Sequence, residues 1–327
     1  MKPSVLLIYG THNEHLGLWD DLNEDFRVII RKTQLRISSK IGLLSYKVFL
    51  YFDHFIKTSF KHHFFQYNDI FKMVKDIDHL IIIDDALRNI NIKELEECKK
   101  INPDIKIYLY LLNSMEAHSP LMRGVRPKID KFKWERVYTF DPQDAIRYGY
   151  QYLGFNYYSS HPSISLQQNE IHPSDVFFVG GLKGGRTNLV YELYKYFLQK
   201  RVTSDFYLMK YGKKEVEQLP GINYYQGWRP YAEILKHVQQ TKCNVEIVQD
   251  GQSGATLRYF EAVCMNKKLI SNNPEIVNFP FYNPKWMKYF KDINDLDIEW
   301  IRRDENVDYN YKGEFSPVHL IDYILNN

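Results

Sequence analysis

Short hydrophobic runs rich in β-branched and aromatic residues alternate along the chain with segments of helical periodicity. This alternation is typical of doubly wound α/β folds, in which helices connect the strands of a parallel sheet. In the first half it predicts strands at 4–9, 27–30, 79–84, 105–112 and 136–140, and helices at 45–60, 92–100 and 142–148. In the second half it predicts strands at 176–179, 205–209, 222–225, 244–248 and 268–271, and helices at 187–198, 230–239, 254–265 and 317–325.

A polar segment at 157–175 interrupts this alternation. It contains two prolines and shows no periodicity, which is typical of a linker between domains. We therefore predict an N-terminal Rossmann-like lobe at 1–156 and a C-terminal Rossmann-like lobe at 176–327, with the option that the last helix packs back on the first lobe. The expected fold is α/β, with two Rossmann-like lobes that face a cleft.

Composition narrows the class of protein. A length of 327 residues suits two domains of ordinary size. The net charge of +3 is too small to indicate a nucleic-acid partner. Three widely spaced cysteines predict neither a disulfide framework nor a zinc site, and no stretch is long enough for a membrane-spanning helix. We expect a cytoplasmic protein.

The most informative segment is QDGQSGATLRYFEAVCMNKKLISNN at 249–273, a strand end followed by a loop, a helix and a short strand. Small residues in the loop let an anion approach the free amides at the helix start, where the helix dipole favours negative charge. A carboxylate further along the helix can accept hydrogen bonds from both hydroxyls of a ribose. The residues predicted to bind a ligand with phosphate and ribose groups here are Ser253, Gly254, Ala255, Thr256, Arg258 and Glu261.

The order of small-residue loop, Arg-Tyr-Phe-Glu-Ala and Asn-Lys-Lys-Leu-Ile-Ser-Asn-Asn resembles the donor-binding motif of GT-B glycosyltransferases. The layout is also similar to bacterial glycosyltransferases of capsule, exopolysaccharide and lipopolysaccharide synthesis. The resemblance implies that Glu261 binds the ribose and that residues 253–256 contact phosphate. Many retaining members carry a second glutamate about seven residues upstream, where this chain has Gly254. The sequence therefore leaves the stereochemical outcome open.

Two further loops of the second half are candidates for the donor site. The segment FVGGLKGGR at 178–186 lacks the order of a P-loop but resembles the segment that opens the C-terminal lobe of GT-B enzymes. The segment YQGWRPY at 225–231 either frames the nucleobase or places Trp228 in the core, with Pro230 at the first helical position. Lys210, which follows the predicted strand at 205–209, is a further candidate. The two loops and this position add the following residues to the candidates: Gly180, Gly181, Lys183, Gly184, Arg186, Lys210, Gly227 and Trp228.

Polar residues that follow the first, third and fourth predicted strands are candidates for the catalytic base, since an inverting sugar transfer needs a group that deprotonates the acceptor hydroxyl. The shortlist is His12, Glu14, Asp84, Asp85, Glu116 and His118, and we rank Glu116 and Asp84 first. No metal-binding cluster is apparent. The resemblance implies metal-independent hexosyl transfer in which cations and helix dipoles neutralise the diphosphate. We expect no cofactor, because the UDP-sugar or GDP-sugar is a substrate.

The sequence thus predicts a glycosyltransferase that moves a sugar from a nucleotide-sugar to a hydroxyl of a glycan or lipid-linked acceptor in surface polysaccharide synthesis. One alternative is a nucleotide-sugar-binding or scaffold protein of a polysaccharide-assembly complex without catalysis. Another is a GT-B-shaped epimerase. A dehydrogenase is disfavoured, because no GxGxxG motif follows the first strand. The stretch 45–75 either docks at the inner face of the membrane or packs against its own sheet.

Overall fold

The computed structural model describes residues 4–10, 17–33, 73–116, 120–159, 171–182, 185–210, 218–227 and 229–327. The chain forms two compact units. The first consists of Met1–Glu14, Asp20–Asn113 and Ser119–Tyr138, and the second of His15–Trp19, Ser114–His118 and Thr139–Asn327. None of the helices within the described ranges is long and apolar enough to cross a bilayer.

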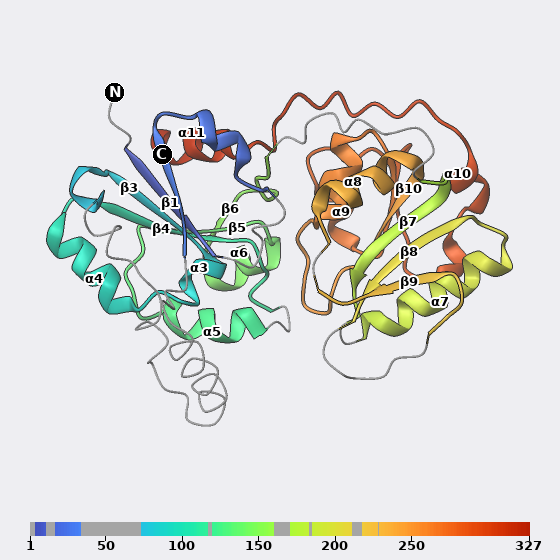
Figure 1. The fold of residues 1–327 in the computed structure, drawn as a ribbon, viewed down its shortest axis with the longest axis horizontal. Coiled ribbons are helices and arrows are strands. Elements are labelled where there is room, and N and C mark those ends of the chain that lie inside the picture. Colours follow the sequence, from blue (N-terminus) through green and yellow to red (C-terminus); the bar gives the residue numbers. More distant parts are fainter. Residues whose placement is uncertain are drawn as a thin grey trace, which may run out of the picture. The chain divides into compact units, whose positions relative to one another are not determined.

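The first sheet has six strands in the order β2-β1-β3-β4-β5-β6, and β1 pairs in parallel with β2 and β3, as β3 does with β4 (Figure 1). Its centre is hydrophobic, and the side chains of Leu80 to Ile83 are completely buried. The elements are β1 (Val5–Tyr9), η2 (Asp20–Glu24), β2 (Val28–Lys32), η4 (Val74–Asp76), β3 (His79–Ile83), α3 (Asp84–Leu87), α4 (Ile92–Ile101), β4 (Lys106–Leu111), α5 (Pro120–Ile129), β5 (Arg136–Thr139), α6 (Pro142–Tyr148) and β6 (Gln151–Tyr152).

The second sheet has six strands in the order β12-β11-β10-β7-β8-β9, all in parallel pairs. The sheet starts in its middle with β7 and grows first through β8 and β9, then on the other side through β10 to β12. The elements are β7 (Ser174–Gly181), α7 (Arg186–Gln199), β8 (Ser204–Met209), β9 (Ile222–Tyr225), α8 (Tyr231–Gln240), β10 (Thr241–Glu246), α9 (Leu257–Cys264), β11 (Lys268–Ser271), η5 (Pro274–Asn278), β12 (Met287–Tyr289), η6 (Ile293–Asp295), α10 (Ile298–Arg302) and α11 (Pro317–Asn326).

The predicted fold class, α/β with two Rossmann-like sheets, is confirmed. The match is closest where local chemistry fixes the ends of an element. Helix α6 begins and ends as predicted, because Asp141 accepts the amides of Gln143 and Asp144 and Gly149 adopts a left-handed conformation after the last turn. Helices α3, α5 and α10 and strands β6 and β12 were not predicted. The helix predicted at 45–60 lies outside the described residues.

Helix α9 begins at Leu257, three residues later than predicted. Thr256 is its N-cap, and the Thr256 side chain accepts the amide of Arg258 at 3.1 Å. The residues before Thr256 form an extended turn whose amide groups bond outside the helix. This turn, rather than the first helical residues, is the segment that the sequence assigns to phosphate.

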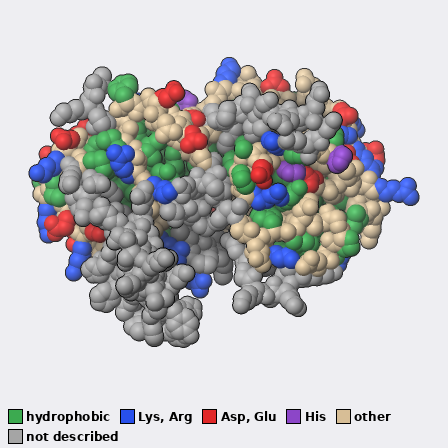
Figure 2. Space-filling model, in the orientation of Figure 1, with side chains coloured by type: hydrophobic (Ala, Val, Ile, Leu, Met, Phe, Trp, Pro, Cys, Tyr) green, Lys and Arg blue, Asp and Glu red, His purple; other side chains and the backbone are tan. Residues whose placement is uncertain are grey.

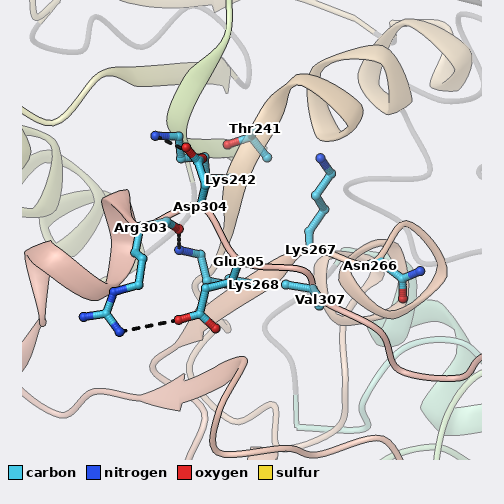
Figure 3. Close-up of a pocket in the computed structure, with 9 residues that line it drawn as sticks. All are labelled: Thr241, Lys242, Asn266, Lys267, Lys268, Arg303, Asp304, Glu305 and Val307. Atoms are coloured by element: carbon cyan, nitrogen blue, oxygen red, sulfur yellow. Dashed lines mark hydrogen bonds and ion pairs between the residues drawn. The ribbon is translucent and has the colours of Figure 1, made fainter.

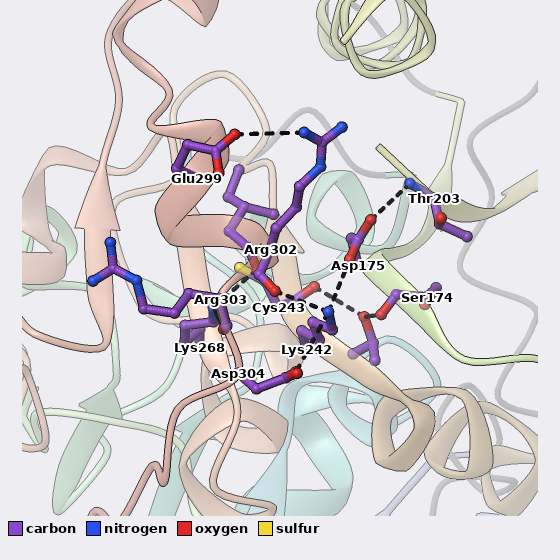
Figure 4. A network of polar contacts seen from close by, with 12 residues as sticks. Ser174, Asp175, Thr203, Lys242, Cys243, Lys268, Glu299, Arg302, Arg303 and Asp304 are labelled. Carbon is purple, nitrogen blue, oxygen red and sulfur yellow. Dashed lines mark hydrogen bonds and ion pairs between the residues drawn. The ribbon is translucent and has the colours of Figure 1, made fainter. Parts of the chain in front are cut away.

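A polar pocket lies at the edge of the second sheet where β10 and β11 begin (Figure 3). The ammonium group of Lys268 donates to the carbonyl oxygens of Trp300, Ile301 and Arg303 at the end of α10. Lys242 donates to Arg302 O at 2.8 Å and contacts two carboxylates (Figure 4). Because these cations already bind carbonyl groups, the pocket stabilises the attachment of α10 and is not our candidate functional site.

Candidate functional site

Parallel pairing places the carboxyl ends of all strands of the second sheet at one edge. The last residues of β7, β8, β9, β10 and β11 are Gly181, Met209, Tyr225, Glu246 and Ser271. Between β7 and β10 the chain changes the direction in which it builds the sheet. Open α/β sheets bind ligands at the carboxyl ends of the strands on either side of such a switch point. The predicted donor residues that the structure describes belong to strand ends at this edge, to the loops that follow them, or to the helices that follow these loops.

Glu246 fixes the start of α9 at this edge. Its buried carboxylate accepts the amide of Thr256 at 3.0 Å and the hydroxyl of Thr256 at 2.6 Å. It also accepts the Ser271 hydroxyl at the end of β11. Burial raises the pKa of Glu246, while these hydrogen bonds oppose the increase. One carboxylate therefore joins β10, α9 and β11, and the Thr256 amide is already bonded within the protein.

The turn before α9 binds a carboxylate of the same compact unit. Asp141 accepts the amides of Ser253 and Gly254 at 2.8 and 3.0 Å, together with the Ser253 hydroxyl. A side chain at Gly254 would place its Cβ 2.5 Å from ring atoms of Phe140, and Ala255 is also buried. The turn has the anion-binding geometry expected from its small residues, and in this structure the anion is Asp141.

Glu261 has no exposed surface. Its Oε1 accepts the Tyr231 hydroxyl at 2.7 Å and a nitrogen of the Arg258 guanidinium. Its Oε2 has no hydrogen-bond partner among the described residues, and the same holds for the buried Nη1 of Arg258. Burial raises the pKa of Glu261 to about 7, against the lowering effects of Arg258 and Tyr231. A ligand with hydroxyl and phosphate oxygens would satisfy both atoms.

The loop after β7 is held by Arg186, the first residue of α7. Its guanidinium donates to Gly181 O and, at 3.2 Å, to Ile247 O beyond β10. Arg186 thus joins the two loops of the switch point. Gly180 fits closely, because an added Cβ would lie 2.9 Å from the Phe178 ring. Asp250 borders the α7 start, where its carboxylate would be 3.1 Å from a Cβ at position 185.

Cations and tyrosines meet at the ends of β8 and β9. The Lys210 ammonium lies 4.7 Å from the centre of the Tyr224 ring. The Arg229 guanidinium lies 4.7 Å from the centre of Tyr207 and 5.8 Å from that of Tyr225. Burial raises the pKa of Tyr225, and the charges of Arg258 and Arg229 oppose this increase. Two cations therefore act electrostatically on Tyr225: Arg258 of α9 and Arg229 of the loop after β9. Gly227 follows with a positive φ of 79°.

Asp84, a leading candidate base, has a buried carboxylate that forms hydrogen bonds within the first unit. Its Oδ2 accepts the amides of Leu112 and Asn113 at 3.0 and 2.9 Å and the Asn113 side chain at 3.0 Å. Burial, with the charge of Asp85, raises the pKa of Asp84 to about 7. Asp85 is also buried and accepts the Gly10 amide at 2.7 Å. Both carboxylates join strand ends of the first sheet.

Glu116, the other leading candidate, belongs to the second unit and is partly exposed. Its carboxylate accepts the Tyr148 hydroxyl and forms an ion pair with Arg147 at 3.1 Å. The structure brings it to the predicted phosphate turn, because a Cβ at Gly251 would lie 2.8 Å from the Glu116 carbonyl oxygen. Ser114 donates to Gly251 O at 3.2 Å in the same place.

Five predicted site residues lie outside the described residues: His12, His118, Lys183, Gly184 and Trp228. Glu14 from the shortlist does so as well. No group of three or more His, Cys, Asp or Glu side chains within the described part of the chain is arranged to hold a metal ion.

Sequence reasoning missed Asp141, Tyr231 and Glu246. Asp141 had a local signal, since an acid at the carboxyl end of a predicted strand lies where α/β folds bind ligands, but this signal does not predict that Asp141 binds the turn before α9. Tyr231 lies 30 residues from Glu261 and Asp141 lies 112 from Ser253. Contacts at such separations have no local pattern.

No protein-family model matches the sequence, and no curated protein does. Solved structures match along the full chain. An alpha-glucosyltransferase in complex with UDP and a 13-mer DNA containing an HMU base gives a TM-score of 0.59 at 11% identity, covering 100% of this chain and 99% of that one.

Two further matches cover 100% of this chain. The alpha-glucosyltransferase in complex with UDP-glucose and DNA containing an abasic site gives a TM-score of 0.51 at 10% identity over 99% of its chain. The UDP-forming alpha,alpha-trehalose-phosphate synthase from Burkholderia xenovorans gives 0.50 at 10% identity over 98% of its chain. The chain therefore has the fold of GT-B glycosyltransferases, as its donor-like motif led us to expect. At this identity the likeness establishes the fold alone.

Proposed function

We propose that the protein is a glycosyltransferase that takes a sugar from a nucleotide-sugar bound at the carboxyl edge of the second sheet. The observation that carries this proposal is the neighbouring pair Arg258 and Glu261. Each has a buried polar atom without a hydrogen-bond partner among the described residues. Leaving such atoms unpaired costs about 1–3 kcal/mol each, so buried polar atoms normally have partners. A nucleoside diphosphate supplies suitable groups, since ribose hydroxyls donate to a carboxylate and phosphate oxygens accept from a guanidinium.

In the proposed donor complex, Glu261 Oε2 accepts from the ribose and Arg258 Nη1 binds the diphosphate. Lys210 and Arg229 add positive charge from the neighbouring loops. The amides of Ser253 and Gly254 do not bind the diphosphate in this complex, since Asp141 occupies them. Cations compensate the leaving diphosphate, which is consistent with transfer that needs no metal.

The acceptor in this proposal is a hydroxyl of a glycan or of a lipid-linked glycan, and Glu116 is its base. Glu116 is supported by its partial exposure and by its position next to Gly251 of the turn before α9. Asp84 is less suited, because its carboxylate is buried and engaged by three donors. His12 and His118 stay candidates on sequence alone. The place in surface polysaccharide synthesis and the peripheral membrane contact rest on the sequence resemblance and the 45–75 stretch.

Calorimetric titration with UDP, GDP, CMP and TDP tests the donor site. UDP comes first, because the matched structures include one with UDP, one with UDP-glucose and one called UDP-forming. We expect one nucleotide to bind, and Glu261→Gln to weaken it roughly 10- to 100-fold, the worth of hydrogen bonds to a charged group. Glu299→Gln is the matched control, because that side chain is 82% exposed in the same unit.

Equal affinities of the Glu261→Gln and wild-type proteins would refute the donor site. Catalysis is tested separately by the release of the nucleotide from its sugar conjugate in the presence of candidate acceptors. Binding without release under any of these conditions would favour the alternative of a nucleotide-sugar-binding protein.

A further inference from the structure

Three tyrosines follow one another at every second position in the sequence Arg-Tyr-Gly-Tyr-Gln-Tyr, residues 147–152. Tyr148 ends α6, and Gly149 adopts a φ of 69°, which turns the chain into β6. Tyr150 directly precedes β6, and Tyr152 is the last residue of this two-residue strand. We name Tyr148, Tyr150 and Tyr152 the tyrosine strip.

The outer two rings of the tyrosine strip, those of Tyr148 and Tyr152, are exposed to solvent. The Tyr148 and Tyr150 rings stack with their centres 5.4 Å apart and their planes within 20°. Tyr148 is 39% exposed and Tyr152 is 37% exposed, and Tyr150 between them is half-buried. Exposed aromatic surface on a folded domain is often an interaction site.

Charged groups border these rings. The Tyr148 hydroxyl donates to Glu116, which also pairs with Arg147. At the other end, the Leu153 amide donates to Thr139 O at 3.0 Å, which places Tyr152 beside the strand end that Asp141 follows. Burial raises the pKa of Tyr152, and the charges of Asp141 and Glu275 add to this increase. Flat apolar faces with polar groups at their rim match a pyranose ring, whose C–H face stacks on an aromatic plane while its hydroxyls bond sideways.

The two ends of the tyrosine strip are joined to the turn before α9 within the second unit. Glu116, at the Tyr148 end, has its carbonyl against Gly251. Asp141, near Tyr152, binds the amides of Ser253 and Gly254. A sugar on the strip would therefore lie beside the loop that precedes the proposed donor-binding helix, with Glu116 at its rim.

We infer that the tyrosine strip binds a sugar ring of the acceptor, which makes the acceptor a glycan; this inference rests on the proposed function. Nucleic acid fits less well, because Arg147, a cation at the Tyr148 end of the strip, already pairs with Glu116. Lys and Arg side chains are also interspersed with acidic ones on the face of the described residues that Figure 2 shows. A bilayer surface fits less well, because carboxylates border both ends of the strip.

Saturation-transfer NMR with maltotriose, cellotriose and chitotriose, in the presence of UDP, tests the inference. We expect transfer to at least one trisaccharide and a roughly two- to tenfold weaker affinity in Tyr150→Ala, the effect of losing one stacked ring. Tyr150→Phe keeps the ring and should bind like the wild type. Tyr289→Ala is the matched control, because Tyr289 is 40% exposed on β12. The dissociation constant for UDP should be the same in all four proteins.

The inference fails if Tyr150→Ala binds the trisaccharide as well as the wild type does. It also fails if UDP binds but no trisaccharide does, an outcome that leaves the proposed donor site intact. If the wild type does not bind UDP but does bind a trisaccharide, and Tyr150→Ala weakens that binding, the donor proposal is refuted instead. A 13-mer DNA and phosphatidylglycerol vesicles serve as competing probes, and binding of either that depends on Tyr150 would overturn the assignment to a glycan.

Discussion

Replacing Tyr231 with phenylalanine should change how nucleotide binding depends on pH. Tyr231 donates to Glu261 Oε1 at 2.7 Å in a fully buried setting, and burial raises its own pKa far above neutrality. The phenol therefore stays a hydrogen-bond donor throughout the neutral range. This hydrogen bond stabilises the charged form of Glu261. Because it engages Oε1, the ligand can bind Oε2. Tyr231 is thus a positioning residue for Glu261.

The size of the effect follows from this hydrogen bond. A bond to a charged group contributes about 1.5–3 kcal/mol, and a change of one pKa unit corresponds to about 1.4 kcal/mol. The pKa of Glu261 is raised to about 7, so loss of the phenol should raise it further by about one unit or more. Arg258 still opposes the increase, and Cys264 is the other titratable group near the phenol. UDP affinity should therefore increase through about pH 7 in the wild type and through about pH 8 in Tyr231→Phe.

Calorimetry at half-unit intervals from pH 6 to pH 9 measures both curves. The ionisation of UDP affects both proteins equally and cancels in their ratio. That ratio should be largest near pH 7 and approach one at pH 9, where Glu261 is charged in both. A ratio that is constant over this range would show that Tyr231 contributes only to packing, and the reasoning would be refuted. Glu261→Gln should lose the transition.

Two further predictions concern the candidate bases. Asp84→Asn keeps an oxygen for the three donors and removes the buried charge. Since the folded-state pKa of Asp84 is raised from 3.8 to about 7, its contribution to stability is present at low pH and lost between these values. As the pH rises from 3.8 to about 7, the free energy of unfolding of the wild type, measured in urea, should therefore fall by about 1.4 kcal/mol per pH unit relative to that of Asp84→Asn. A difference between the two proteins that does not change with pH would contradict this. Glu116→Gln should lower kcat about 10²- to 10⁴-fold with UDP affinity unchanged, and wild-type turnover would exclude Glu116 as the base.

Local sequence signals account for most of the architecture. Period-two and continuous hydrophobic runs locate the central strands, and β9 and β11 have the predicted boundaries. The caps of α6 are readable from Asp141, Pro142 and Gly149. Short elements such as α3 and β12 escape prediction, because three or four residues carry too little periodicity and form where neighbouring strands supply partners.

The sequence by itself determined the two alternating α/β halves, the helix that carries Arg258 and Glu261, and the small-residue turn before it, because these depend on near neighbours in the chain. Tertiary structure decided which groups meet there. It brought Tyr231 to Glu261, Asp141 to the turn, and Glu116 to Gly251, and it buried Asp84. Burial and the pairing of distant side chains set the charge state and accessibility of each residue, and neither has a signature within a local stretch of sequence.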